Sequence, residues 1–492
     1  MEMKVGQKPE IRALEDSAKS LYQKERAIHW NRVSRLKEND KRIGAFYHQL
    51  LRKYYQYLIS PGLRVLELGC GHGDLLAALK PSQGVGIDFS LQMLHRAQGK
   101  HPHITFVLAD AHELPLKGKF DVIILSDLVN DLWDVQEVLE KLDPITHSGT
   151  RLVLNFYNNL WRVPLAVIKQ LKLGAELLEQ NWFSPHDVYN LLELAGFEVI
   201  HHRPLILFPL HLPFISTLGN RYLVNFPVFN WLALTNFVIA RPAPTNRKSV
   251  SHKDLSVSVV VPARNEEGNI ENIFKRVPSM GSQTELIFVE GHSSDHTYET
   301  ILEMIRQYSD RKCKVFRQSG KGKGDAVRLG FKEARGDILL ILDADLTVPP
   351  EDLKRFVKAL ISGKGEFING VRLVYPLENQ SMRFLNMVGN KFFSLAFSWL
   401  LGQPIKDTLC GTKVLWKRDY DAIARNREYF GNFDPFGDFD LLFGAAKLNL
   451  KIAEMPIRYR SRIYGDTNIN RWEHGWMLLR MVFFAARRIK FI

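Results

Sequence analysis

The chain has 492 residues, of which 46% are hydrophobic and 24% charged, and its formal net charge is +13. These are the proportions of globular domains, which excludes collagen-like, coiled-coil and wholly disordered architectures, and a chain of this length divides into two or three domains. The excess of Lys and Arg favours anionic partners such as a membrane surface, phosphorylated substrates or nucleic acid.

The cysteine content and the hydropathy pattern predict an intracellular protein. The three cysteines, Cys70, Cys313 and Cys410, are too few and too far apart for a disulfide framework, which favours a reducing compartment. The N-terminus lacks the apolar core of a signal peptide. The sequence contains no run of about 18 uncharged apolar residues, so it predicts no transmembrane helix.

Along the chain, short β-rich runs alternate with helical stretches twice. The first alternation extends from RVLEL at 64–68 to a final strand at 236–242, and the second from SVSVVVPA at 256–263 to GTKVLWK at 411–417. Such alternation predicts parallel sheets covered by helices, so the expected fold class is α/β with two tandem Rossmann-like domains. The expected divisions are a helical segment 1–60, a domain 61–242, a polar linker 243–254, a domain 255–471 and a basic amphipathic helix 472–492.

A glycine loop and two aspartates form the first candidate site. Gly69, Gly71 and Gly73 follow a strand that ends at Glu67–Leu68, and glycines here let the backbone approach a ligand closely. Asp88 ends the next strand, where a carboxylate can bind a ribose diol, and Asp110–Ala111 ends the third, where an adenine edge would lie.

This constellation resembles the class I S-adenosylmethionine-dependent methyltransferases over residues 61–242, which implies a seven-stranded sheet and S-adenosylmethionine as cofactor. The resemblance assigns cofactor contacts to Glu67, Gly69, Gly71, Asp88 and Asp110, and Gly73 and Ala111 complete the predicted set. A dinucleotide-binding dehydrogenase shares the physics of the loop. The methyl acceptor cannot be read from the sequence; a base, if one is needed, would be Asp127, Asp131 or His147, while Cys70 is interpreted as a small filler.

Two carboxylates form the second candidate site. An apolar strand terminates in Asp343-Ala344-Asp345, and two hard oxygen ligands at a strand end suit Mg²⁺ or Mn²⁺ carrying a diphosphate. The segments expected around them contain Pro262, Ala263, Arg264, Asn265 and Glu266 after the first strand, Glu290 and Asp295 after the second, and Lys323 in the KGKGDA segment that opens a helix.

These segments, in this order, resemble family 2 inverting glycosyltransferases of the GT-A fold over about 255–471, with most similarity to the dolichyl- or polyprenyl-phosphate branch. The resemblance implies a nucleotide-sugar donor and places Arg372 and Arg462 near the donor diphosphate and the acceptor phosphate. The chain departs from the family pattern at Glu290-Gly291, often Asp-Asp, and at Thr347, often Gln.

The acceptor class decides whether a general base is needed. A sugar hydroxyl would need one, with Asp438 or Asp440 as candidates. A lipid phosphate is already anionic and needs cations instead, which Arg372 and the arginines at 458, 460 and 462 can supply.

Three apolar segments favour a lipid-linked acceptor: an aromatic insert at 204–234, residues 384–402 and the C-terminal helix, whose basic sector is typical of the membrane interface. No nucleic-acid-binding signature is present.

We therefore interpret the chain as a bifunctional, cytoplasmic enzyme that contacts the inner face of the membrane peripherally. It would transfer a sugar to a polyprenyl phosphate or lipid-linked glycan and a methyl group to an unknown acceptor. The alternative is transfer to a saccharide hydroxyl, with the first domain as a binding or tethering module.

Overall fold

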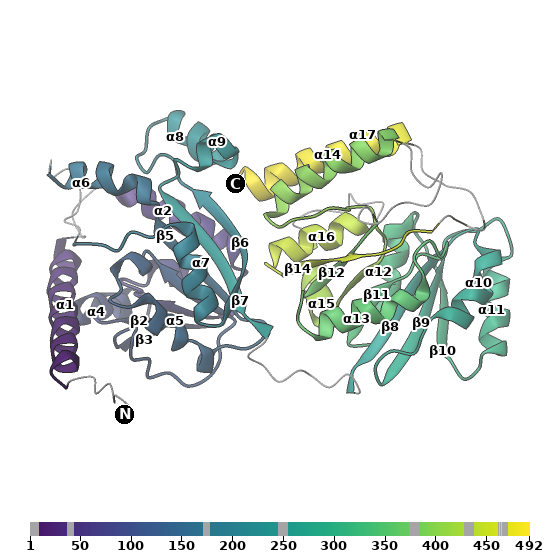
Figure 1. Ribbon diagram of the computed structural model, residues 1–492, viewed down its shortest axis with the longest axis horizontal. Coiled ribbons are helices and arrows are strands. Elements are labelled where there is room, and N and C mark those ends of the chain that lie inside the picture. Colours follow the sequence, from purple (N-terminus) through teal and green to yellow (C-terminus); the bar gives the residue numbers. More distant parts are fainter. Residues whose placement is uncertain are drawn as a thin grey trace, which may run out of the picture. The chain divides into compact units, whose positions relative to one another are not determined.

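The structure is a computed structural model that describes residues 9–36, 44–170, 178–244, 254–372, 384–427, 437–460, 462, 464 and 471–492. The chain forms two compact units, residues 1–246 and 247–492 (Figure 1). Each unit is built on a seven-stranded sheet. The predicted fold class, two tandem Rossmann-like α/β domains, is confirmed.

The first sheet has the strand order β3-β2-β1-β4-β5-β7-β6. All its pairings are parallel except those of β7, which runs antiparallel to both β5 and β6. The strands are β1 (Arg64–Leu68), β2 (Gln83–Asp88), β3 (Thr105–Leu108), β4 (Val122–Ser126), β5 (Arg151–Tyr157), β6 (Phe197–Leu205) and β7 (Thr235–Pro242). Because β1 lies between β2 and β4, the glycine loop, Asp88 and Asp127 emerge at one edge.

Successive apolar side chains of each strand point to opposite faces of this sheet. Both faces are therefore apolar and are covered by helices. Leu66 and Leu68 of β1 belong to one apolar cluster, while Val65 belongs to the other. The helices of the unit are α1 (Pro9–Leu36), α2 (Gly44–Leu58), α3 (Asp74–Ala78), α4 (Leu91–Lys100), α5 (Val135–Glu140), α6 (Arg162–Gln170), α7 (Pro185–Leu194), α8 (Ile215–Thr217) and α9 (Pro227–Asn230). Helices α5 and α7 pack in the first cluster, and α2 and α3 in the second.

The second sheet has the order β10-β9-β8-β11-β13-β12-β14. Here β13 alone runs antiparallel, against β11 and β12. The strands are β8 (Ser256–Ala263), β9 (Gln283–Glu290), β10 (Lys312–Arg317), β11 (Ile338–Ile341), β12 (Phe367–Val371), β13 (Lys413–Trp416) and β14 (Ile452–Pro456). Strand β11 ends at Ile341, so Asp343 and Asp345 lie in the loop after the strand and not on it.

The helices of the second unit are α10 (Glu267–Arg276), α11 (Thr297–Gln307), α12 (Lys323–Glu333), α13 (Leu353–Ile361), α14 (Phe384–Leu401), α15 (Lys417–Arg425), α16 (Asp438–Lys447) and α17 (Arg471–Ala485). Helix α17 turns its apolar face inward: Leu478, Met481 and Ala485 are buried in the same cluster as α14 and α16. Part of the apolar surface expected to face a membrane therefore belongs to the core of this unit, while Trp476 and Phe483 of α17 are 62 and 66% exposed. Among the described residues, no helix is both long enough and apolar enough to cross a bilayer.

Candidate functional sites

The glycine loop after β1 adopts a backbone that side chains disfavour. Gly69, Gly71 and Gly73 have φ values of 69, 53 and 71°, in the left-handed region that glycine enters without steric cost. A Cβ atom on Gly71 would project into open space. The loop thus leaves a bare stretch of backbone at the sheet edge, against which a ligand can lie.

Asp88 is held at the end of β2 by the loop itself. Its Oδ2 accepts a hydrogen bond of 2.9 Å from the Gly71 backbone N–H, and its Oδ1 accepts one of 2.8 Å from Ser90 N–H. These two bonds orient the carboxylate at the end of the strand. The ribose-binding role of Asp88 stays a prediction.

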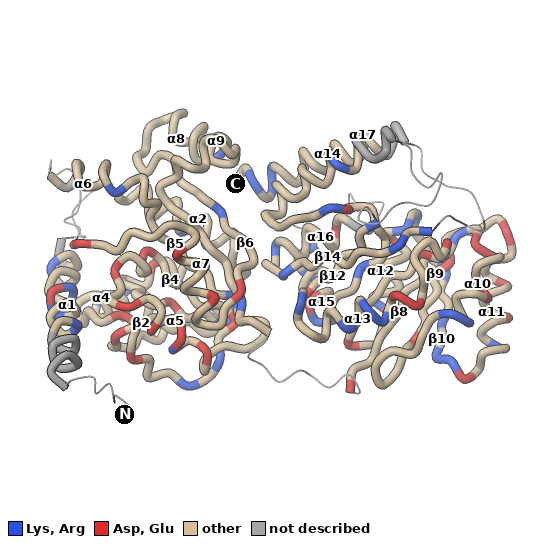
Figure 2. Tube along the Cα trace, in the orientation of Figure 1, with Lys and Arg blue, Asp and Glu red and all other residues tan. Residues whose placement is uncertain are grey.

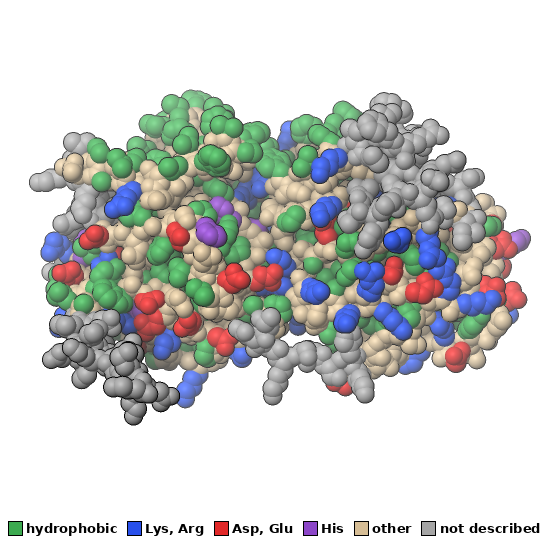
Figure 3. All heavy atoms as spheres, viewed as in Figure 1, with side chains coloured by type: hydrophobic (Ala, Val, Ile, Leu, Met, Phe, Trp, Pro, Cys, Tyr) green, Lys and Arg blue, Asp and Glu red, His purple; other side chains and the backbone are tan. Residues whose placement is uncertain are grey.

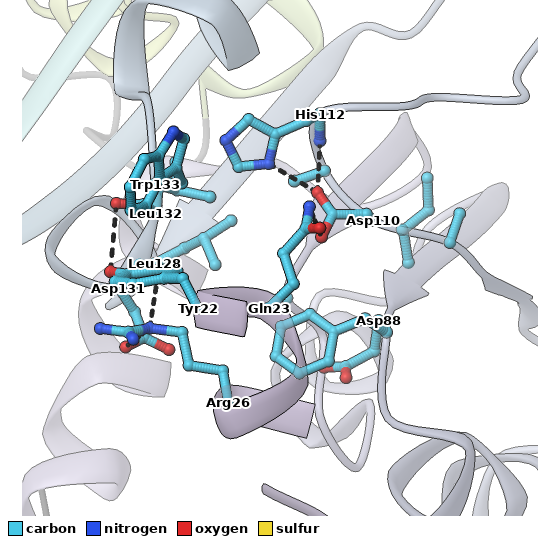
Figure 4. A pocket seen from close by; sticks show the side chains of 15 residues that line it. Tyr22, Gln23, Arg26, Asp88, Asp110, His112, Leu128, Asp131, Leu132 and Trp133 are labelled. Atoms are coloured by element: carbon cyan, nitrogen blue, oxygen red, sulfur yellow. Dashed lines mark hydrogen bonds and ion pairs between the residues drawn. The ribbon is translucent and has the colours of Figure 1, made fainter. Parts of the chain in front are cut away.

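Asp110 and Ala111 line a cavity of about 30 Å³ together with Gly69 and Asp88 (Figure 4). Strand β3 ends at Leu108, two residues before Asp110. The Asp110 carboxylate accepts bonds from the His112 backbone N–H at 2.8 Å and contacts His112 Nδ1 at 2.6 Å. Burial alone would raise the pKa of Asp110, but the bonds to His112 outweigh it and lower the pKa.

Helix α1 lies across this cavity and was not predicted to take part in the site. Gln23 Nε2 donates to Asp110 Oδ2 at 3.0 Å, and Tyr22 and Arg26 also line the cavity (Figure 4). The Gln23 amide thus occupies the Asp110 oxygen that was expected to face an adenine edge. A cofactor bound there would compete with Gln23 for this oxygen.

Glu67 provides an independent test of whether a cofactor fits. The side chain is buried, and one carboxylate oxygen, Oε2, has no hydrogen-bond partner within the described structure. Burial raises the pKa of Glu67 well above its ordinary value, despite a bond from the Leu76 backbone. Since buried polar atoms are rarely left unpaired, this oxygen fits a site for a hydrogen-bond donor on a ligand. The bare loop and this unpaired oxygen agree with the set of residues expected for S-adenosylmethionine.

The three candidate bases occupy different places. His147 Nε2 lies 2.9 Å from Asp121 Oδ1, and Asp121 also pairs with Arg64 at the start of β1; this is the opposite edge of the sheet from the glycine loop. Asp131 lines the cavity but bonds Arg26 at 2.9 Å and Trp30 at 3.0 Å. The structure therefore separates His147 from the candidate site.

Asp127, the third candidate base, follows β4 at the same edge as the loop. It accepts hydrogen bonds from the Tyr47 hydroxyl at 2.8 Å and from Asn155 Nδ2 at 2.5 Å. Its φ is +53°, an uncommon backbone state for a residue with a side chain. Burial, then the negative charge of Asp127, raises the pKa of Tyr47, so this tyrosine stays a neutral donor to the carboxylate.

In the second unit, Asp343 pairs with Lys323. The Nζ of Lys323 lies 2.6 Å from Asp343 Oδ1, and Lys323 is the first residue of α12, where the helix dipole favours anions. Burial raises the pKa of Asp343, but Lys323 outweighs that effect, so the pKa lies below its usual range. A Cβ on Gly411 would collide with both partners, which keeps that segment close against the pair.

Asp345 pairs with Arg462. Arg462 Nη2 lies 2.7 Å from Asp345 Oδ2, and Thr347 donates to Asp345 Oδ1 from its hydroxyl at 2.8 Å and its backbone N–H at 3.1 Å. Thr347, where the family often has Gln, thus orients the carboxylate. The two aspartates predicted as metal ligands each carry a cationic partner.

Glu266 joins the same cluster from the loop after β8. Its Oε1 lies 3.8 Å from Arg462 Nη1, and its Oε2 accepts a 2.7 Å bond from Asn269. Burial, with smaller contributions from the charges of Asp345 and Asp343, raises the pKa of Glu266 to about 7. Within the described residues, no group of three His, Cys, Asp or Glu side chains is arranged to hold a metal ion.

Arg372 is held in an ion pair with Asp407. Its guanidinium makes two bonds to Asp407, 2.7 Å from Nε to Oδ2 and 2.8 Å from Nη2 to Oδ1. Burial lowers the pKa of Arg372, but Asp407 outweighs burial and raises it above its usual range. Asp407 begins the sequence DTLCGTKV at 407–414, but nothing in the sequence marked it as the partner of Arg372. The pair joins the residue directly after β12 to the segment before β13.

Asp440, the candidate base, pairs with Arg427 at 2.8 Å. It lies in the first turn of α16, and a Cβ on Gly437 just before this helix would meet the Gly324 Cα at 2.6 Å. The N-termini of α16 and α12 therefore meet close to Lys323. The Asp438 side chain, the other candidate, lies outside the described residues.

The loops after β8 and β9 lock together. Asn265, with φ of +57°, accepts a 2.8 Å bond from the Ser294 backbone, and Gly291 N–H donates to the Ala263 carbonyl at 2.9 Å. Asp295 supports the start of α11 by accepting a 3.1 Å bond from Thr297 N–H.

The remaining residues predicted to bind the nucleotide-sugar are placed as follows: Pro262 half-buried at the end of β8, Arg264 exposed, Glu290 buried and bonded to Ser293 N–H, and Ala344, after β11, buried in the core.

The arginines at 458, 460 and 462 do not act as one group. Arg462 reaches Asp345, whereas Arg458 and Arg460 line a depression of about 380 Å³ shared with Arg276 and Arg355. Arg276 is neutralised there by two bonds to Glu351, of 2.8 and 3.0 Å. Residues Gly465-Asp466-Thr467-Asn468, at which the chain also departs from the family pattern of Gly-x-Ser-Lys, lie outside the described residues.

Comparisons with known proteins agree with this division. The family described as "Glycosyl transferase family 2" matches residues 258–441, and a "Methyltransferase domain" matches residues 36–202. A dolichol-phosphate mannosyltransferase of Pyrococcus furiosus is 38% identical over 221 residues, which cover 44% of this chain and 59% of that protein. An undecaprenyl-phosphate 4-deoxy-4-formamido-L-arabinose transferase of Edwardsiella ictaluri is 36% identical over 111 residues, 22% of this chain and 34% of that protein.

The matches to these two curated relatives thus span 59% and 34% of their lengths. Among solved structures, an S-adenosylmethionine-dependent methyltransferase of Mesorhizobium loti is similar with a TM-score of 0.32 at 22% identity, covering 40% of this chain and 98% of that one. A glucosyl-3-phosphoglycerate synthase of Mycobacterium tuberculosis is similar with a TM-score of 0.35 at 20% identity, covering 48% and 80%.

Proposed function

Because the chain contains a methyltransferase domain followed by a family 2 glycosyl transferase domain, we propose that it is a bifunctional enzyme of lipid-linked glycan synthesis. The second domain transfers a sugar from a nucleotide-sugar to a polyprenyl phosphate, or to a lipid-linked glycan, with inversion. The first domain transfers a methyl group from S-adenosylmethionine to a product or intermediate of the same pathway.

The observation that carries the sugar-transfer proposal is the cluster formed by Asp343, Asp345, Lys323 and Arg462. Two carboxylates stand two residues apart in the loop after a buried strand, and each is paired with a cation, at 2.6 and 2.7 Å. Carboxylate oxygens suit Mg²⁺ or Mn²⁺, and such an ion, when bound with a nucleoside diphosphate, supplies charge stabilisation for the leaving group. Asp343 and Asp345 would hold the ion, which releases Lys323 and Arg462 to pair with phosphate oxygens.

The acceptor assignment rests on charge. A lipid phosphate is an anionic nucleophile and needs no base, but it must approach a donor diphosphate, so cations near both are required. Arg462 is placed between Asp345 and Glu266 and can neutralise phosphate there. Asp440 is engaged by Arg427, which does not favour it as a free base for a hydroxyl acceptor. The relatives named for transfer to dolichol phosphate and undecaprenyl phosphate support the same acceptor class.

For methyl transfer, the proposal assigns binding roles to the residues of the first site. The glycine loop provides backbone for close approach, Asp88 receives the ribose diol, Asp110 the adenine amino group, and Glu67 a donor of the methionine part. S-adenosylmethionine, when bound, supplies an electrophilic methyl group. Positioning of a nucleophile in line with that methyl group can supply much of the rate, and Asp127 is the carboxylate at this edge that could orient an acceptor hydroxyl.

A lipid acceptor would set the reaction at a membrane surface, so the proposal includes peripheral contact with the cytoplasmic face. The test is a screen of nucleotide-sugars with Mn²⁺ or Mg²⁺, with and without polyprenyl phosphate, followed by methyl transfer from labelled S-adenosylmethionine to the purified product. We expect release of the sugar from the nucleotide-sugar to depend on the ion and to rise when polyprenyl phosphate is present. We also expect the purified product to accept the labelled methyl group. Turnover with a saccharide acceptor alone would overturn the lipid assignment, and labelling only of an unrelated small molecule would overturn the link between the two domains.

A further inference from the structure

The first unit carries an exposed apolar surface far from its sheet core. It is formed by the insert 206–234 between β6 and β7, which contains α8 and α9, and by the neighbouring segment 159–167; we call it the apolar crest (Figure 3). Phe214, Val228, Trp231 and Val163 are 88, 78, 76 and 70% exposed. Exposure this high means that the side chains project outward and do not line a groove. Isolated exposed apolar residues are ordinary, but a contiguous group marks an interaction surface.

The crest is a built structure. The Asn220 side chain accepts bonds from the backbone N–H groups of Leu207 and Phe208 at 2.7 and 2.8 Å. Asn158 Nδ2 donates to the Trp231 carbonyl at 2.8 Å, which ties the two segments of the crest together. Leu207, Val224 and Ala233 form a small core beneath it. These bonds and this core hold the insert in place while several of its large apolar side chains remain exposed.

The segments that form the crest carry charge of one sign. No Asp or Glu occurs between Glu198 and Asp254, and the tube over α8 and α9 shows no acidic residue (Figure 2). The exposed cations Arg162 and Arg221 lie within the two segments of the crest. An apolar surface with aromatic residues, bordered by Arg and lacking carboxylates, is complementary to the interface of an anionic bilayer, where apolar burial and attraction to lipid headgroups act together.

We infer that the apolar crest docks the first domain onto an anionic lipid surface, with its aromatic and aliphatic side chains in the acyl–headgroup boundary and Arg162 and Arg221 against lipid phosphates. This inference deepens the peripheral membrane contact of the proposed function by naming the surface that makes it. It also narrows the three apolar segments that the sequence favoured to the insert. The C-terminal helix buries Leu478, Met481 and Ala485 in the second domain and leaves Trp476 and Phe483 exposed, whereas more of the apolar side chains of the crest are exposed.

The test is co-sedimentation of the full chain with phosphatidylcholine vesicles, with and without phosphatidylglycerol. We expect binding that is stronger to the vesicles containing phosphatidylglycerol. The double variant Val228→Ser, Trp231→Ser should bind about tenfold or more weakly, because two large apolar groups no longer leave water. The matched control is Leu91→Ser with Leu194→Ser, two leucines exposed to similar extents, 59 and 67%, outside the crest, and it should bind as the unchanged protein does.

Charge-reversal variants test the electrostatic contribution to vesicle binding separately. Arg162→Glu with Arg221→Glu should remove the preference for phosphatidylglycerol, whereas reversal of the exposed Lys117 and Lys141 should leave it. Equal binding of the crest variant and the unchanged protein would overturn the inference. So would a crest variant that changes the oligomeric state but not vesicle binding, since a second copy would then be the occupant. Sugar transfer to a polyprenyl phosphate in detergent is measured in parallel: its absence with vesicle binding intact counts against the proposed function alone, and its presence without vesicle binding counts against the crest alone.

Discussion

Arg462 and Asp345, 117 residues apart in the sequence, are joined by an ion pair of 2.7 Å. The pair brings the segment after β14 over the loop after β11, where the two aspartates lie. Arg462 also approaches Glu266 at 3.8 Å. One guanidinium therefore balances carboxylates from two loops, in the place where a nucleoside diphosphate and a divalent ion would bring their own charges.

Removing the Asp345 charge should abolish sugar transfer and spare the fold. Asp345→Asn keeps the shape of the side chain but removes a metal ligand and the partner of Arg462, so we expect kcat to fall about 100-fold or more. Turnover of the nucleotide-sugar at saturating Mn²⁺ measures it. Asp310→Asn, at an exposed loop position, is the control. Activity within a few fold of the unchanged protein would show that Asp345 is not a ligand.

Glu266 should make the stability of the metal-free protein fall as the pH rises. Its pKa is about 7 in the folded state, against an ordinary 4.5. The folded chain therefore holds this proton between about pH 4.5 and 7 while the unfolded chain has lost it; the contribution is complete below that window and is lost as the pH rises through 7. Glu266→Gln removes this dependence, so above pH 7 its stability relative to the unchanged protein should improve by an amount on the order of 2 kcal/mol.

Thermal unfolding from pH 4 to 9 measures the Glu266 effect. Glu271→Gln is the control, since Glu271 lies on α10, the helix that follows Glu266, and is exposed with Lys275 as its partner at 2.6 Å. Parallel pH profiles for Glu266→Gln and the unchanged protein would contradict the prediction.

Alanine substitutions in and outside the glycine loop should separate the effect of backbone strain on stability from the effect of a blocked site on cofactor binding. Gly71 and Gly62 both have positive φ, 53 and 79°, and both have open space where a Cβ would lie. Alanine at either position should cost about 1–2 kcal/mol of stability from the left-handed backbone. Only Gly71→Ala places a methyl group against the expected cofactor, so it should weaken S-adenosylmethionine binding by about tenfold or more. Calorimetry on the full chain decides; equal affinities for the two variants would reject this site.

Asp440→Asn distinguishes the two acceptor classes. With a lipid phosphate acceptor, kcat should fall less than about tenfold, because no base is required. The variant leaves Arg427 without its carboxylate partner, so it should melt at a lower temperature, and the rate must be measured well below that point. Asp421→Asn, on α15, is the control. A loss of several hundredfold in kcat at a temperature where the protein is folded would favour a saccharide hydroxyl as acceptor.

Much of both sites follows from local sequence. Asp88 ends β2, Asp110 lies two residues after β3, and Gly69 and Gly71 lie one and three residues after β1. Parallel strands bring their carboxyl ends to one edge. Asp343 and Asp345 follow the apolar run of β11 in the same way. Their positions relative to the sheets are therefore decided by strand periodicity and by the order of the strands.

What the sequence by itself determined is this sheet framework: two α/β domains, the loop glycines and the acidic residues at strand ends, because alternating apolar side chains and glycine turns are properties of neighbouring residues. Only the tertiary structure decided the partners. It paired Arg372 with Asp407, set His147 at the opposite edge, laid Gln23 of α1 against Asp110 and packed one face of the C-terminal helix into the core of the second unit. Those contacts join residues far apart in the chain, so they depend on which elements pack together, and no spacing within a single segment encodes that.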